Sequence, residues 1–233
     1  MTFKGLIFDK DGTLFHFQES WGDWMYQVID ELTDGKTGEK NLMADSLGFN
    51  LKEKEFLNNS VFIAGAAGEF VSCIEPYSQN LKGDDLMEFI TNKSINLVQK
   101  PVTNLPLLFR HLKSKNILLG IATNDCEKPA LSQLEAAKIL TYFDFVAGSD
   151  SGYGAKPKAG QLLKFLSEFN LVPNDVAMIG DSTYDLKAAK TAQMYSLGVL
   201  TGVATEKELS PYADIILKSI EDLPDWLQLN TTR

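Results

Sequence analysis

The sequence predicts an α/β protein in which a doubly wound parallel sheet carries an inserted helical domain. Short apolar runs with little polar alternation, which are typical of strands buried on both faces, occur near the N-terminus and again after residue 100. Segments with helical spacing of apolar residues separate the later runs, and this strand–helix alternation favours parallel strands joined by right-handed crossovers. Residues 17–97 contain only helical patterns, which indicates an insertion after the first strand.

Six apolar runs are predicted as strands of one sheet. They cover residues 3–8, 117–122, 143–147, 176–179, 195–200 and 213–217. Helices are predicted between them at 105–112, 129–139, 159–169 and 184–192. This order predicts a Rossmann-like catalytic core made of residues 1–15 and 99–233.

The inserted segment is predicted as an α-helical cap domain over residues 16–98. Helical patterns occur at 21–32, 38–47, 52–57, 64–75 and 84–98, and glycine-containing turn signals separate several of them. The stretch FIAGAAGEF at 62–70 is rich in small residues, which suits either close packing or a cap loop that faces the active site.

Composition limits the class of partner. The 233 residues carry a net charge of −9, which argues against a nucleic-acid-binding surface because such a surface needs clustered Lys and Arg. No run of about eighteen apolar residues is present, so we expect no membrane span. Cys73 and Cys126 are far apart in the sequence and are interpreted as reduced thiols, so we expect a cytoplasmic protein. The acidic balance also means that an anionic substrate must meet its positive charge in a few residues or a metal. The oligomeric state is not predicted.

Polar side chains follow four of the predicted strands, at the point where each strand ends. Ligands of open α/β sheets bind beyond these carboxyl ends, so we expect the side chains to meet there. They are Asp9, Asp11, Thr123, Asn124, Lys156, Asp181 and Asp185.

This set of side chains suits phosphoryl transfer. Asp9 and Asp11 are two positions apart in an extended chain, so both can face one pocket. A carboxylate can attack phosphorus to form an acyl phosphate, and a second carboxyl can protonate the leaving oxygen and later deprotonate water. Mg²⁺ takes carboxylate ligands, which Asp9 and Asp181 can provide with support from Asp185.

Two further polar residues suit the phosphoryl group itself, and a third is ambiguous. Thr123 offers a donor hydroxyl and Lys156 a positive charge, and both are what a phosphoryl group needs. Asn124 suits either substrate contact or a helix cap. Lys10, between the two acids, is expected to matter least.

Four segments together resemble the motifs of the haloacid dehalogenase superfamily, in the same order. They are DKDGTL (9–14), GIATND (120–125), the pair Lys156–Pro157, and IGDSTYD (179–185). The resemblance implies that Asp9 is the nucleophile and Asp11 the general acid/base. It implies that Thr123 and Lys156 bind phosphate and that Asp181 and Asp185 are the acids of the magnesium site. The metal would also be held by the main-chain carbonyl of Asp11.

Three features indicate which branch of the superfamily this chain resembles: Asp11, the helical insertion and Trp21. The phosphatases and phosphomutases of this superfamily carry an acid at the position of Asp11, whereas its dehalogenases lack it. The helical insertion is similar to the cap of the phosphoglycolate phosphatase and β-phosphoglucomutase group. Phosphomutases carry a cap histidine where this chain has Trp21. We therefore expect a magnesium-dependent phosphatase acting on a small phosphorylated metabolite, with phosphoglycolate the leading named substrate. The alternatives are a phosphomutase and a catalytically quiet member that binds a phosphorylated ligand or a partner.

Overall fold

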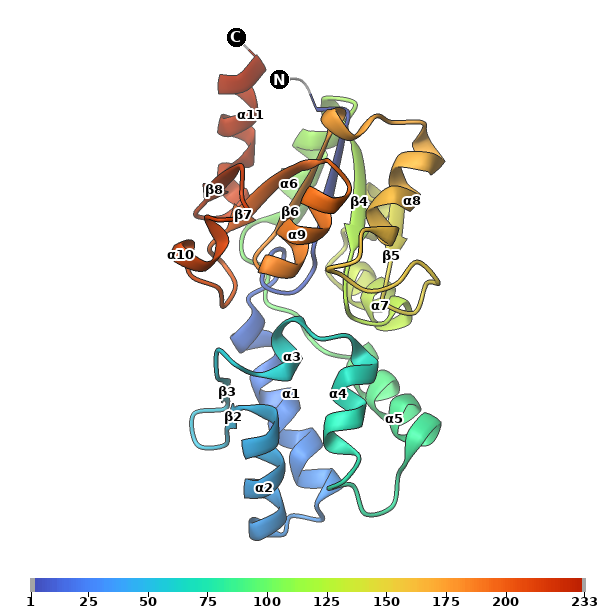
Figure 1. Cartoon of the computed structure of the whole chain (residues 1–233), viewed down its shortest axis with the longest axis vertical. Coiled ribbons are helices and arrows are strands. Elements are labelled where there is room, and N and C mark those ends of the chain that lie inside the picture. Colours follow the sequence, from blue (N-terminus) through green and yellow to red (C-terminus); the bar gives the residue numbers. More distant parts are fainter. Residues whose placement is uncertain (1–2, 232–233) are drawn as a thin grey trace.

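Apolar segments build a six-stranded parallel sheet in the computed structural model, which describes residues 3–231 (Figure 1). The strands are β1 (Gly5–Phe8), β4 (Leu118–Ala122), β5 (Phe145–Ala147), β6 (Val176–Gly180), β7 (Tyr195–Val199) and β8 (Ile215–Leu217). Their order is β5-β4-β1-β6-β7-β8, and every neighbouring pair is parallel. The predicted fold class is confirmed, and each observed strand overlaps its predicted range.

Helices cover both faces of this sheet because successive residues of β1 point to opposite sides. Leu6 and Phe8 join a buried cluster with α6 (Leu105–Ser114) and α11 (Leu223–Thr231), whereas Ile7 joins another cluster with α8 (Gly160–Phe169) and α9 (Thr183–Thr191). This burial on both faces explains the continuous apolar runs of the strands.

The remaining core elements include one larger helix and several short ones. α7 (Glu127–Ala136) ends earlier than the predicted 139 because Lys138 turns the chain with a left-handed φ of 59°. α10 (Glu206–Leu209), α11 and the 3₁₀ turns η1 (Leu140–Tyr142), η2 (Pro173–Asp175) and η3 (Ile220–Asp222) were not expected.

A group of helices from the segment between β1 and α6 packs around its own hydrophobic cluster, below the sheet in Figure 1. Its elements are α1 (Phe17–Leu32), α2 (Thr37–Leu47), β2 (Phe49–Asn50), β3 (Glu55–Phe56), α3 (Val61–Ala64), α4 (Ala67–Ile74) and α5 (Gly83–Ile95). The two connections to the core run side by side, because Phe15 bridges Pro101 and the His16 amide donates to the Lys100 carbonyl at 2.8 Å. The predicted domain boundaries at 16 and 98 stay predictions.

The helix predicted at 52–57 is wrong. Residues 51–54 form turns, and β3 pairs with β2 in a two-stranded antiparallel ribbon. The Asn50 side chain accepts hydrogen bonds from the amides of Lys52 and Glu53 at 3.0 and 3.1 Å, which favours a tight turn over a helix. Gln18 on α1 then holds Phe56 by bonds to both its amide and its carbonyl.

The helix predicted at 64–75 is divided. α3 ends at Ala64 and α4 begins at Ala67, and the extended backbone of Gly65 and Ala66 separates them. A Cβ at Gly65 would lie 2.4 Å from the Val61 carbonyl oxygen, so the bend requires glycine.

No helix within residues 3–231 is long and apolar enough to span a membrane.

Candidate active site

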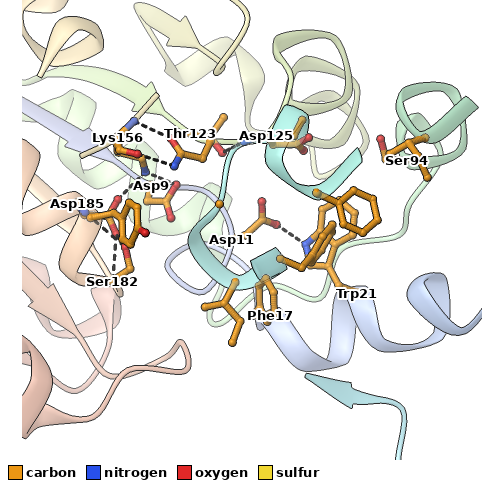
Figure 2. Close-up of a pocket in the computed structure, with 18 of the residues that line it drawn as sticks. Asp9, Asp11, Phe17, Trp21, Ser94, Thr123, Asp125, Lys156, Ser182 and Asp185 are labelled. Atoms are coloured by element: carbon orange, nitrogen blue, oxygen red, sulfur yellow. Dashed lines mark hydrogen bonds and ion pairs between the residues drawn. The ribbon is translucent and has the colours of Figure 1, made fainter. Parts of the chain in front are cut away.

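The carboxyl ends of β1 and β6 bring three acidic side chains together around one lysine. Asp9 follows β1, and Asp181 and Asp185 follow β6; one carboxylate oxygen from each of the three lies within 4.8 Å of the other two. The Lys156 ammonium contacts Asp9 Oδ1 at 2.8 Å and Asp185 Oδ1 at 2.5 Å. All four residues are buried, and Figure 2 shows Asp9, Lys156 and Asp185 gathered on the core side of the pocket.

The three clustered carboxylates and Lys156 carry more negative than positive charge when all are ionised. Burial, together with the nearby Asp185, raises the pKa of Asp9 to about 7 despite Lys156. Burial and the charges of Asp9 and Asp185 likewise raise the pKa of Asp181 well above its ordinary value. The two carboxylates raise the pKa of Lys156 against the opposing effect of burial, so the lysine stays charged. Three buried carboxylates with one lysine therefore fit a metal ion, which would stabilise their ionised forms.

Two glycines make room for the Asp181 side chain. A Cβ at Gly202 would lie 1.7 Å from Asp181 Oδ2, and a Cβ at Gly12, where φ is +79°, would lie 2.3 Å from the same atom. Thr13 donates to Asp181 Oδ1 at 3.3 Å, and Thr201 donates to the Gly12 carbonyl at 2.7 Å. The first motif and the loop after β7 thus enclose the carboxylate from two sides.

Asp185 is positioned by the start of α9. Ser182 is the N-cap, and it forms a capping box in which its amide and hydroxyl donate to Asp185 Oδ2 at 3.0 and 2.6 Å. Because Asp185 Oδ1 accepts from Lys156, both oxygens of this fully buried carboxylate have partners within the protein.

Asp11 lies apart from the three clustered carboxylates and faces the cap. Its Oδ1 accepts from the Trp21 indole Nε1 at 2.7 Å and from Gln99 Nε2 at 3.0 Å, as Figure 2 shows for Trp21. The Asp11 carboxylate is not a member of the group that can hold an ion, and the expectation that the main-chain carbonyl of Asp11 binds the metal stays a prediction. Trp21 on α1 thus links the cap to the acid of the first motif.

The expectation that Lys10 matters least is wrong. Lys10 is fully buried, and its Nζ contacts Asp11 Oδ2 at 2.6 Å, Asp125 Oδ2 at 3.2 Å and Gln133 Oε1 at 2.6 Å. Burial alone would lower the pKa of Lys10, but Asp11 and Asp125 raise it, so the residue is a cation. No signal in a single sequence marks this lysine, because lysine side chains are mostly exposed.

Gln133 and Gln99 extend this network between core and cap. Gln133, on α7, donates to the Ser94 carbonyl at the end of α5 at 2.9 Å and accepts from Gln99 at 2.7 Å. Gln99, on the return connection, also donates to Asp11. The position of the Asp11 carboxylate is therefore set by contacts from both domains.

Thr123 and Asn124 occupy the loop after β4, as predicted. Thr123 is buried, and its hydroxyl oxygen accepts from the Asp125 amide at 3.1 Å. The Asn124 side chain clamps the main chain of Lys156, accepting from its amide at 2.8 Å and donating to its carbonyl at 2.9 Å. Asn124 thus positions the lysine loop, where the Lys156–Pro157 peptide is cis, and it also lines the pocket.

Asp150 and Asp125 support the site rather than enter the carboxylate group. Asp150 accepts from the Glu127 amide at 2.8 Å at the start of α7, which is a structural contact. Asp125 pairs with Lys10, and the N-cap position of α7 belongs to Cys126.

The pocket above these residues is closed by the cap. Its core side carries Asp9, Asp11, Thr123, Asn124, Asp125, Lys156, Ser182, Tyr184 and Asp185, and its cap side carries Phe17, Trp21, Trp24, Phe62, Ile63, Gly65, Ala67, Phe70, Ile90 and Ser94. Most of the stretch 62–70 that was ambiguous in sequence therefore faces the site. Figure 2 shows Phe17 and Trp21 opposite the core carboxylates.

Comparison with known proteins identifies relatives that match either most of the chain or about half of it. A family model described as haloacid dehalogenase-like hydrolase matches residues 6–199. A stretch of 113 residues is 33% identical to phosphoglycolate phosphatase of Escherichia coli, and it covers 48% of this chain and 45% of the relative. A candidate pyrophosphatase, PpaX, of Clostridium perfringens is 25% identical over 207 residues, which is 88% of this chain and 87% of that protein.

The fold is shared with solved structures. A crystal structure of a predicted phosphoglycolate phosphatase from Haemophilus somnus matches with a TM-score of 0.75 and 18% identity, over 97% of this chain and 98% of that one. At 18% identity this similarity shows a shared fold and does not show a shared activity.

Proposed function

This chain belongs to the haloacid dehalogenase-like hydrolase family, and we propose that it is a magnesium-dependent phosphatase acting on a small phosphorylated metabolite. The observation that carries the proposal is the position of the Asp9 carboxylate. It lies beside the Lys156 ammonium at 2.8 Å and within the group formed with Asp181 and Asp185, at the floor of a pocket that Asp11 also lines.

Asp9 is the nucleophile of this proposal. One carboxylate oxygen attacks phosphorus as the bond between phosphorus and the leaving oxygen breaks, which leaves an aspartyl phosphate on Asp9. Lys156, held by Asn124 through its main chain, supplies a fixed positive charge to the phosphoryl oxygens. Thr123 lines the same part of the pocket and suits donation to the phosphoryl group.

Asp11 is the general acid and base. As a carboxylic acid it gives its proton to the leaving oxygen, and as a carboxylate it then takes a proton from the water that attacks the aspartyl phosphate. The hydrogen bonds from Trp21 and Gln99 and the ion pair with Lys10 orient this carboxyl toward the pocket. Closure of the cap over the pocket excludes bulk water during the first step.

Asp9, Asp181 and Asp185 are the residues that would hold the magnesium ion. When bound, the ion supplies positive charge that keeps these carboxylates ionised and offsets the charge of the phosphate. The enclosure of Asp181 by Gly12 and Gly202 and the locked position of Asp185 support a site with little freedom to rearrange.

The phosphomutase alternative has less support. Neither His16 nor His111 lines the pocket, and Trp21 stands where the mutase histidine would be. A protein that only binds a ligand would not need Asp11, so the complete set of catalytic residues also favours turnover.

The test is hydrolysis of para-nitrophenyl phosphate with and without Mg²⁺, in the wild type and in two variants. Asp9→Asn should abolish turnover, and Asp11→Asn should lower kcat by about 10²–10⁴-fold while substrate and metal still bind. Asp23→Asn is the matched control, because this carboxylate is exposed on the cap and pairs only with Lys54. Full activity in Asp9→Asn would overturn the assignment of the nucleophile. Activity in EDTA equal to that in Mg²⁺ would overturn the proposed dependence on magnesium.

A further inference from the structure

We propose that the physiological substrate of this site is the phosphomonoester of a neutral alcohol that carries a flat apolar ring and at least one oxygen acceptor. This inference rests on the proposed phosphatase function and concerns the leaving group alone. It disfavours phosphoglycolate, whose leaving alcohol, glycolate, carries a carboxylate.

The first support is the aromatic wall that the cap presents to the site. The side chains used in the argument are Phe17, Trp21, Trp24, Phe62, Ile63 and Phe70, all of which line the pocket. Phe62 is at the centre of this wall, with ring centroids 5.1 Å from Trp21, 5.7 Å from Trp24 and 4.9 Å from Phe70. Phe62 and Ile63 are only partly buried, so they keep apolar surface that a ring of the leaving group can cover.

The second support is the charge of the lining. Among the described residues that line the pocket, Lys156 is the one cation, and it is already paired with Asp9 and Asp185. Four carboxylates line the same pocket, those of Asp9, Asp11, Asp125 and Asp185. A carboxylate on the leaving group would therefore enter a low-dielectric pocket without a cation to pair with on the cap side, which is unfavourable.

The third support is a buried donor without a partner. Trp24 is 5% exposed, and its indole Nε1 has no hydrogen-bond partner among residues 3–231. A buried N–H that lacks an acceptor is costly, whereas the neighbouring Trp21 satisfies its own Nε1 with Asp11. Trp24 lines the pocket, and an ether, carbonyl or hydroxyl oxygen on the leaving group that reached its Nε1 would satisfy this donor and fix the orientation of the ring of the leaving group.

The experiment compares three esters that share the same reacting group. Benzyl phosphate has a neutral aromatic leaving group, ethyl phosphate has a neutral small one, and phosphoglycolate has an anionic one. With Mg²⁺, we expect kcat/KM for benzyl phosphate to exceed that for ethyl phosphate by at least about tenfold, because the ring buries apolar surface. We expect phosphoglycolate to fall about tenfold below ethyl phosphate.

Two cap variants connect this ranking to the pocket. Phe62→Ala should lower the ratio of kcat/KM for benzyl over ethyl phosphate by at least about fivefold. Ile63→Lys adds the missing cation at the same wall and should raise the ratio of phosphoglycolate over ethyl phosphate by about tenfold. Circular dichroism and the melting temperature check that each variant is folded, and ratios within one variant cancel any general loss of active protein.

The acceptor is tested with ring-substituted esters. At least one of the three methoxybenzyl phosphates should be preferred over benzyl phosphate by the wild type, and Trp24→Phe, which keeps the ring and removes the N–H, should abolish that preference. Equal rates for all four esters in the wild type would remove the acceptor from the proposal.

The outcomes separate this inference from the proposed function. Turnover of phosphoglycolate at or above the rate of benzyl phosphate, in a wild-type enzyme that also hydrolyses para-nitrophenyl phosphate, would overturn the leaving-group class and leave the phosphatase intact. Hydrolysis of none of these esters would overturn the phosphatase proposal and the inference with it.

Discussion

Replacement of Lys10 by methionine tests whether the buried cation organises the site. The change keeps a side chain of similar length and removes the charge from a position with 0% exposure. Asp11 and Asp125, whose side chains are each 15% exposed, would then have no cation, and Gln133 Oε1 would lose its donor from Lys10.

The expected cost follows from these contacts. Removal of one partner of a buried ion pair destabilises a protein by about 3–5 kcal/mol, because the remaining charge stays buried. Asp11 keeps the hydrogen bonds from Trp21 and Gln99, so we expect the lower end, about 3 kcal/mol. A second change, Asp125→Asn, should recover about 1 kcal/mol or more in the Lys10→Met background, since it removes one of the two uncompensated charges.

Urea unfolding followed by far-ultraviolet circular dichroism measures these differences. A loss of about 3 kcal/mol should lower the unfolding midpoint by about 1 M or more. The matched control is Lys4→Met, whose lysine pairs with Asp175 at 2.6 Å but has a side chain that is 65% exposed, so its loss should cost at most about 1 kcal/mol. If Lys10→Met costs no more than Lys4→Met, the reasoning about this buried cation is refuted.

Two further changes test the metal site and an acid-sensitive contact of the core. Gly202→Ala places a Cβ 1.7 Å from Asp181 Oδ2, so it should weaken Mg²⁺ binding by about tenfold or more. Calorimetry measures this loss directly, and the melting temperature should rise less on adding Mg²⁺ than it does in the wild type. Gly38→Ala, whose added carbon would meet nothing within 4 Å, should match the wild type. Burial alone would raise the pKa of Asp214, but hydrogen bonds from Lys190 and Ser196 hold it below its ordinary value of 3.8. The ionised carboxylate therefore stabilises the fold above the unfolded pKa, and this stabilisation disappears as pH falls through the lower folded pKa. Asp214→Asn should lower the melting temperature at pH 7 by a few degrees and approach the wild type near pH 3, whereas an equal deficit at both pH values would contradict the assignment.

Local patterns in the sequence were sufficient where the physical cause is local. The strand β1 is buried on both faces, so its residues are apolar without interruption, and Asp9 follows where the strand leaves the sheet. Ser182 and Asp185 are three positions apart, which is the spacing of a capping box, and the structure has that capping box at the start of α9. The hairpin at β2 and β3 was missed because a side-chain turn at Asn50 overrides the short helical pattern of 52–57.

The sequence by itself determined the sheet, the helical insertion and the loops that carry the candidate catalytic residues, because periodicity and parallel topology place strand ends at one edge. Only the tertiary structure decided what surrounds Asp11. Gln133 lies 123 positions from Lys10 and Gln99 lies 88 positions from Asp11, yet each pair is in hydrogen-bond contact. The burial of a lysine depends on such distant partners, and no local pattern records them. For the same reason, the apolar and cation-poor lining of the pocket cannot be read from local sequence, because it depends on which cap residues pack over the core.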